Sequence, residues 1–257
     1  MDRLFVNLKY QCAWDEHSWR NVDSVVKHFL PDHQQRGRVT VRRVNVSTAH
    51  GVIDSFLKLY DHRADGWRFW MRASKARREF ENYAAFAQLE VPAAEAIACG
   101  EERDRLGRLH RAFILTRAVP NACGLDEFFK TKPPWQERRQ VLDELANTTR
   151  RLHAASFFYH DLVWRNILVS RDGAMKPHVL FIDCPRGGRA CCGANRKRLR
   201  DLASLDKSAA QFCSRAERLR FLLQYSDRNQ TDDEIRALAQ ACIEYRRTRW
   251  PEDWRGK

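Results

Sequence analysis

The chain has 257 residues, of which 44% are hydrophobic and 31% charged, and its formal net charge is +13. These values exclude disordered, collagen-like and low-complexity proteins, and the length allows a core for one large domain or a two-lobed unit. The excess of basic residues favours a polyanionic partner, which could be nucleic acid, an acidic membrane surface or a phosphorylated substrate.

The sequence contains no long apolar run. The first residues lack the apolar stretch of a signal peptide, and no window suits a transmembrane helix, so we expect a cytoplasmic protein, peripheral on a membrane at most. The eight cysteines form no C-x-x-C pair, which argues against a zinc site or a disulfide scaffold. We expect reduced, mostly buried thiols.

Hydrophobic periodicity and β-branched runs predict the secondary structure. In chain order the predicted elements are a short helix over 23–30, strands over 39–46 and 53–60, a helix over 75–89, strands over 96–101 and 109–116, a long helix over 135–155, short strands over 167–170 and 179–182, and helices beyond residue 197. Asp23 or Ser24 is the expected N-cap of the first helix.

This order predicts an α+β fold rather than an all-α DNA-binding module. We expect two lobes: residues 1–118 with a small antiparallel sheet and one helix, and residues 119–257 with the remaining helices.

Polar residues cluster around the two short strands. Asp161 and Asn166 lie five positions apart, and Asp183 closes an apolar strand 22 positions after Asp161. Two carboxylates and an amide at the ends of short strands can hold Mg²⁺ on a nucleotide and orient a hydroxyl beside it. The alternative is structural, with Asp161 capping a loop and Asn166 forming a turn.

The segment from Tyr159 to Val169 resembles the catalytic loop H-R-D-x-x-x-x-N of protein-kinase-like enzymes. Asp183, with Cys184 and Pro185 behind it, stands in the place of the metal-binding D-F-G. Phe56-Leu57-Lys58 is similar to the strand that presents the phosphate-binding lysine, and Glu79 on the next helix is the expected partner of Lys58. The resemblance implies a protein-kinase-like two-lobed fold.

A narrower resemblance, over roughly residues 36–225, is to the Kdo/WaaP-type lipopolysaccharide kinases, which phosphorylate sugars of the bacterial lipopolysaccharide core. It rests on 57–60, 74–80, 152–153, 160–168 and 198–203. It implies ATP as phosphoryl donor, a heptose or Kdo hydroxyl as acceptor, and the lipopolysaccharide core precursor as partner.

The same resemblance implies the site roles. Asp161 is the expected catalytic base, Asn166 and Asp183 the Mg²⁺ ligands, and Lys58 with Glu79 the pair that positions the α- and β-phosphates. Val163 occupies the place where protein kinases often carry a lysine that contacts the transferred phosphate. We therefore expect Arg165 or Arg186 to supply that positive charge instead.

The chain also departs from the kinase pattern. It has no G-x-G-x-x-G motif, since Gly37 stands alone, so other backbone amides, with Arg36, Arg38 or Arg42, are expected to contact the phosphates. Pro185 fixes φ, which argues against a swinging metal-binding segment. No A-P-E motif follows, so we expect no full platform for a protein substrate.

Several residues also have a purely structural interpretation. Lys58 could be a solubilising charge on an edge strand, and Glu79 competes with Glu81 and with a helical pairing to Lys75. We interpret His153 as a hydrogen-bonded helix-end residue and His160 as a loop-orienting donor.

Two basic clusters stand out in the sequence. The first mixes cations with large apolar residues, which suits an anionic bilayer or a phosphorylated lipid. The alternative is that the cations belong to a solvated helix face and the tryptophans to the core. This cluster comprises Arg63, Trp67, Arg68, Phe69, Trp70, Met71, Arg72, Lys75, Arg77 and Arg78. The second should border the acceptor site and comprises Arg186, Arg189, Arg196, Lys197, Arg198 and Arg200. Nucleic acid is an unlikely partner because no recognition motif is present.

We therefore expect an ATP- and Mg²⁺-dependent kinase acting on a lipopolysaccharide inner-core sugar, at the cytoplasmic face of the inner membrane. Two alternatives remain. One is a small-molecule or protein kinase of the same fold, and the other is a pseudokinase that acts as a binding module at the membrane.

Overall fold

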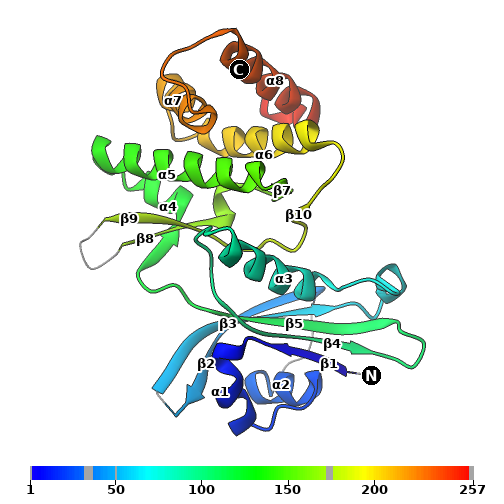
Figure 1. Ribbon diagram of the computed structural model, residues 1–257. Helices are drawn as coiled ribbons and strands as arrows, with labels where there is room; N and C mark the ends of the chain where they lie inside the picture. Colours follow the sequence, from blue (N-terminus) through cyan, green and yellow to red (C-terminus); the bar gives the residue numbers. More distant parts are fainter. Residues whose placement is uncertain (1, 32–36, 50, 172–175, 255–257) are drawn as a thin grey trace. The chain divides into compact units, whose positions relative to one another are not determined.

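The computed structural model describes residues 2–31, 37–49, 51–171 and 176–254 (Figure 1). The chain divides into two compact units, and each is treated by itself. The first unit contains residues 1–85 and 94–119, and the second contains residues 86–93 and 120–257. The division between them falls once inside helix α3, after Ala85.

A five-stranded antiparallel sheet organises the first unit, with strand order β1-β4-β5-β3-β2. The strands are β1 (Asp2–Val6), β2 (Val39–Thr48), β3 (Gly51–Asp61), β4 (Ala96–Arg103) and β5 (Leu109–Arg117). The helical segments are η1 (Leu8–Tyr10), α1 (Gln11–Glu16), α2 (Val22–Phe29), η2 (Gly66–Phe69) and α3 (Lys75–Gln88), which runs into the second unit.

The alternation of β3 gives the sheet two different faces. Leu57 and Leu59 are fully buried in a core cluster that includes Trp14 of α1 and Val25 of α2, so these helices cover one face. Lys58, between the two leucines, points to the other face, where it meets helix α3.

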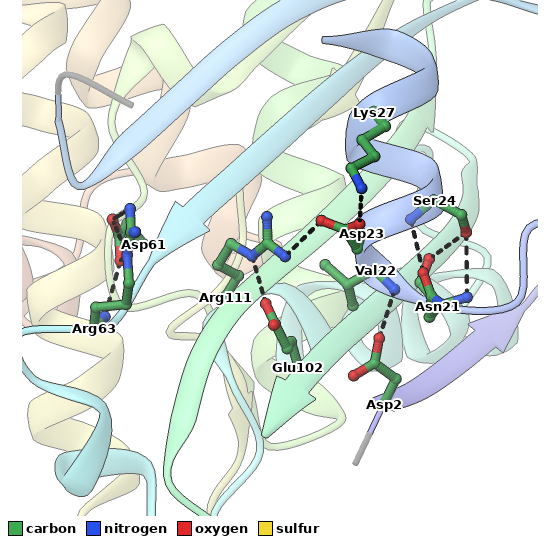
Figure 2. Close-up of polar contacts among 10 residues, drawn as sticks. All are labelled: Asp2, Asn21, Val22, Asp23, Ser24, Lys27, Asp61, Arg63, Glu102 and Arg111. Carbon is green, nitrogen blue, oxygen red and sulfur yellow. Dashed lines mark hydrogen bonds and ion pairs between the residues drawn. The ribbon is translucent and has the colours of Figure 1, made fainter. Parts of the chain in front are cut away.

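Polar contacts join α2 to the sheet (Figure 2). The side chain of Asn21 accepts from the backbone N–H of Ser24, and the Ser24 side chain accepts in return from Asn21, so Asn21 is the N-cap. The expected caps, Asp23 and Ser24, were therefore wrong by two or three positions. Arg111 lies between Asp23 of α2 and Glu102 of β4 and pairs with both carboxylates.

The second unit combines helices with short strands. Its helices are α4 (Leu125–Lys130), α5 (Trp135–Ala154), α6 (Ala194–Ala209), α7 (Arg215–Ser226) and α8 (Asp233–Arg249). Its strands are β6 (Ala122–Gly124), β7 (Phe157–Phe158), β8 (Ile167–Arg171), β9 (Pro177–Phe181) and β10 (Gly188–Arg189). The 3-10 segments are η3 (Trp164–Asn166) and η4 (Pro251–Trp254).

Helix α5 is central to the second unit. Its Ala146 is fully buried in a cluster with Leu202 of α6, Tyr225 of α7 and Cys242 of α8. Strands β6, β8 and β9 form an antiparallel sheet in the order β6-β8-β9, and β7 pairs with β10. The turn between β7 and β8, which contains η3, is thereby fixed at both ends.

The main predicted strands and helices are present, including the helices beyond residue 197. The elements absent from the prediction are short, and the longest of them are β1, α1 and α4. The eight cysteines are free thiols, but only Cys99, Cys184 and Cys242 are buried, so the expectation of mostly buried thiols was wrong. Within the part of the chain that the structure describes, no helix combines the length and apolar character needed to cross a bilayer.

Candidate functional site

In the first unit, Lys58 and Glu79 form an ion pair. Lys58 Nζ of β3 lies 3.4 Å from Glu79 Oε2 of α3, and the two side chains are 18% and 3% exposed. The hydroxyls of Tyr60 and Tyr83 donate to the same carboxylate, each at 3.3 Å. These hydrogen bonds fix the carboxylate, which in turn holds the ammonium group in place.

This geometry decides between the interpretations that the sequence left open. Strand β3 lies between β5 and β2, so Lys58 is not on an edge strand. Glu81 pairs with Arg77 on the surface of α3, and Glu79 is the residue that meets Lys58. A central, largely buried lysine is not a solubilising charge.

In the second unit, the turn after β7 brings Asp161 and Asn166 together. The Asn166 side chain is almost completely buried, and its Nδ2 donates to the backbone oxygen of Asp161 at 2.9 Å. The N–H of Val163 donates to the same oxygen at 2.9 Å. The Asp161 carboxylate is 43% exposed, so it is accessible to a ligand.

Asp183 is joined to this turn through the backbone. The N–H of Ile182, the residue before it, donates to the backbone oxygen of Asn166 at 3.0 Å. The hydroxyl of the buried Tyr159 donates to the oxygen of Ile182. Asp183 has a φ of +58°, a conformation uncommon for residues other than glycine and found often at functional sites.

Asp201 of α6 fixes the turn after β7 and was not among the predicted site residues. Its fully buried carboxylate accepts from the backbone N–H of Tyr159 at 2.7 Å and of His160 at 2.9 Å. Arg200 donates to the His160 oxygen at 3.0 Å, which holds His160 at a φ of +71°. The available signal was an aspartate at the start of the apolar run Leu202-Ala203.

His153 has the structural role expected of it. His153 Nδ1 lies 2.8 Å from the Tyr225 hydroxyl, and its Nε2 lies 3.4 Å from Asp201 Oδ2. The pKa of His160 is lowered, first because the ring is buried and then because Arg200 is close. A neutral His160 keeps an additional positive charge away from the turn.

The donor set suits Mg²⁺, which prefers oxygen ligands. Because the Asn166 NH₂ group donates to the protein, its amide oxygen is the atom oriented to accept a cation. Asp183 supplies a carboxylate one residue after the Ile182 contact. No group of three or more His, Cys, Asp or Glu suited to a metal occurs among the residues with described positions, so the fit depends on the asparagine.

Arg165 is close to Asp161 but loosely held. Its Nη2 lies 3.8 Å from Asp161 Oδ2, and its side chain is 75% exposed. An arginine with this freedom can turn toward a phosphate. The expected phosphate contact Arg36 lies outside the described residues, whereas Arg38 is described and lies 4.0 Å from Asp65.

The fold, a small antiparallel sheet together with several helices, is of the protein-kinase-like class. A solved structure described as "WaaP in complex with acyl carrier protein" matches with a TM-score of 0.68 at 20% sequence identity, covering 96% of this chain and 97% of that chain. This likeness shows the fold. A search among curated protein sequences finds no match.

The family model "Lipopolysaccharide kinase (Kdo/WaaP) family" matches residues 40–230, most of the chain. This chain belongs to that family, and it is therefore a kinase that uses ATP and belongs to lipopolysaccharide biosynthesis. The resemblance inferred from the sequence is confirmed.

Proposed function

We propose that this protein is an ATP- and Mg²⁺-dependent kinase that phosphorylates a heptose or Kdo hydroxyl of the lipopolysaccharide inner core. Two hydrogen bonds carry the proposal. The Asn166 side chain donates to the backbone oxygen of Asp161, and the backbone N–H of Ile182 donates to the backbone oxygen of Asn166. These contacts link, through the backbone, the two segments that carry Asp161, Asn166 and Asp183, in a chain of the lipopolysaccharide kinase family.

Each residue has a role in the proposed transfer. Asp161 accepts the proton of the sugar hydroxyl while the hydroxyl oxygen forms a bond to the γ-phosphorus of ATP. The bond between the γ-phosphorus and the bridging oxygen breaks, and ADP leaves with that oxygen. Lys58, held by Glu79, positions the α- and β-phosphates. Arg165 balances charge on the transferred group. Asn166 and Asp183 would hold Mg²⁺, which neutralises phosphate charge when bound.

The proposal also assigns the lobes. Residues 1–118 form the N-terminal lobe that carries the phosphate-binding lysine, and residues 119–257 form the C-terminal lobe that carries the catalytic turn and the metal ligands. The protein would work at the cytoplasmic face of the inner membrane, as a peripheral protein, because its acceptor is part of a membrane lipid.

Transfer of labelled phosphate from ATP to core oligosaccharide tests the proposal. We expect Asp161→Asn and Asp183→Asn each to lower the rate by about 10²- to 10⁴-fold, because each removes a carboxylate used in the transition state. Asp233→Asn is the matched control, since that side chain is 98% exposed on α8 and should leave the rate unchanged. Mass analysis of the product identifies the sugar.

The outcomes separate the alternatives. Undiminished transfer in Asp161→Asn or Asp183→Asn contradicts the site assignment. Transfer only to proteins or to small amines contradicts the assignment of a core sugar as the acceptor. Metal-dependent binding of ATP without any turnover would mean a pseudokinase.

We also infer that acyl carrier protein is a partner of this chain, as it is of the WaaP protein in the matched structure. The second unit contains a cavity of about 450 Å³, within the range of ligand pockets, which is about 300–1,000 Å³. Its lining is mostly apolar and includes Leu142, Leu145, Leu205, Leu222, Ala239 and Ile243. Such a cavity suits an acyl chain.

Co-elution with acyl carrier protein tests this partnership. We expect the acylated form to bind the wild type more tightly than the unacylated form. Ala239→Trp, which adds bulk to the cavity wall, should remove that difference, whereas Ala87→Trp, at an exposed position of α3, should keep it. Equal binding of both forms by the wild type would contradict the assignment of the cavity.

A further inference from the structure

Two loops of the first unit expose large apolar side chains. One loop, residues 66–72, follows β3 and contains η2, and the other is the turn between β4 and β5, residues 104–107 (Figure 1). Their exposed apolar residues are Trp67 at 53%, Trp70 at 54%, Met71 at 83% and Leu106 at 69%. We name these four residues, with their loops, the apolar tip.

The two loops are joined to each other. Trp70 Nε1 donates to the backbone oxygen of Leu106 at 2.9 Å. Arg103, at the end of β4, donates to the oxygens of Phe69 and Gly107 at 3.0 Å each, and to that of Arg72 at 2.7 Å. One guanidinium group therefore binds both loops.

A buried ion pair supports this arrangement. The side chains of Arg103 and Glu101 are 9% and 0% exposed and lie 3.1 Å apart. Glu101 also accepts from the backbone N–H of Ser74, two residues after the first loop, at 2.6 Å. The core beneath the tip is closed, because a Cβ on the buried Gly66 would lie 1.9 Å from the Leu109 oxygen. The tip side chains are therefore held outside by a fixed scaffold.

The charge around the tip is positive. Arg68, Arg72 and Arg105 are exposed. Two carboxylates lie close by: Asp61 pairs with Arg63 (Figure 2), and Asp104 accepts from the backbone N–H groups of Leu106 and Arg108, so among the described residues the three arginines outnumber the one carboxylate without an arginine partner. Tryptophan and arginine together are typical of surfaces that enter the headgroup region of an anionic bilayer.

We propose that the apolar tip docks this protein onto an anionic phospholipid membrane. Trp67, Trp70, Met71 and Leu106 enter the interfacial region, and the three exposed arginines contact the acidic headgroups. The core tryptophan alternative is wrong for Trp67 and Trp70, because both side chains are exposed. The identity of the membrane rests on the proposed function. Docking itself does not, since it requires no catalysis.

Vesicle flotation of the full chain tests the proposal. We expect binding to phosphatidylcholine vesicles that also contain phosphatidylglycerol, and much weaker binding to phosphatidylcholine alone. Met71→Asp/Leu106→Asp should weaken the first by at least about tenfold, because two exposed apolar side chains no longer enter the bilayer. The matched control is Leu8→Asp/Val52→Asp, at residues 88% and 65% exposed elsewhere in the unit.

A second variant tests the charge. Each arginine near an acidic leaflet contributes about a fivefold gain in binding, so Arg68→Glu/Arg72→Glu should lose at least about 25-fold. Arg3→Glu/Arg20→Glu changes the net charge equally at two other exposed arginines and should lose much less. Thermal melts that match the wild type would show that all variants fold.

An assay of phosphoryl transfer to soluble core oligosaccharide distinguishes the docking proposal from the proposed kinase function. We expect the tip variants to retain this transfer while they lose vesicle binding. Absence of transfer in the wild type would contradict the proposed function and leave docking intact. No binding by the wild type to the acidic vesicles, or undiminished binding by both tip variants, would overturn the docking proposal.

Discussion

The buried carboxylate of Asp201 accepts a hydrogen bond from the backbone N–H of Tyr159 at 2.7 Å, across 42 positions of the chain. A second bond, from the N–H of His160, engages the other carboxylate oxygen at 2.9 Å. Helix α6 therefore fixes the residues that immediately precede Asp161, although it supplies no atom to the proposed chemistry.

Asp201→Asn tests this positioning role. The amide keeps the size but presents an NH₂ group to one of two backbone donors, so we expect a loss of about 1–3 kcal/mol in the free energy of unfolding. We also expect kcat to fall while KM for ATP changes little, because the turn loses its alignment. Urea unfolding and steady-state kinetics check both. A loss of stability with kcat unchanged would contradict the positioning role.

Lys58→Met should leave Glu79 buried beside two tyrosine hydroxyls without its cation. We expect a loss of about 2 kcal/mol in the free energy of unfolding, because removing the ammonium group that faces a carboxylate at 3% exposure is costly. Adding Glu79→Gln should restore part of it. KM for ATP should rise in both variants, because the proposed phosphate contact is gone.

Lys9→Met is the control for that experiment. Lys9 pairs with Glu95 at 2.8 Å, a shorter distance than in the Lys58 pair, but its side chain is 60% exposed. We expect its removal to cost no more than about 1 kcal/mol, since solvent screens exposed pairs. Equal losses in Lys9→Met and Lys58→Met would contradict the claim that burial gives the Lys58 pair its importance.

Acid should destabilise the protein in part through His62. Burial lowers the pKa of His62 below its ordinary 6.5, although Asp65 opposes the shift. Above pH 6.5 the ring is neutral in both states, so no penalty arises. As the pH falls below 6.5, the unfolded chain binds a proton that the folded chain resists, and the free energy of unfolding falls until the pH reaches the folded pKa.

His62→Gln should reduce that slope between pH 6.5 and the folded pKa by up to about 1.4 kcal/mol per pH unit. Urea unfolding across this pH range measures it. Part of the slope should remain, because burial also lowers the pKa of His28 and of His160. Identical slopes in the wild type and in His62→Gln would show that His62 does not contribute.

The long elements and the residue types of the site could be predicted from local patterns. Strands β2 and β3 are rich in β-branched and aromatic residues, and α3 and α5 repeat apolar residues at helical spacing. The spacing of Asp161, Asn166 and Asp183 sufficed to nominate all three. The pairing of Lys58 with Glu79, 21 positions apart, followed from the resemblance and is present in the structure.

The missed elements lacked such patterns. Strand β1 has five residues and is defined by its pairing with β4, nearly a hundred positions away. The N-cap was missed because Asn21, Asp23 and Ser24 are all residue types that favour this position. Only the contacts in the folded chain show that Asn21 occupies it.

The sequence by itself determined which residues are available for chemistry, because periodicity and motif spacing are local properties of the chain. Only the tertiary structure decided how they are used. It placed Lys58 in a central strand, joined the Asp201 carboxylate to the backbone of Tyr159 and left Trp67 and Trp70 exposed. Burial and long-range hydrogen bonds arise only when distant segments pack, so no local pattern contains them.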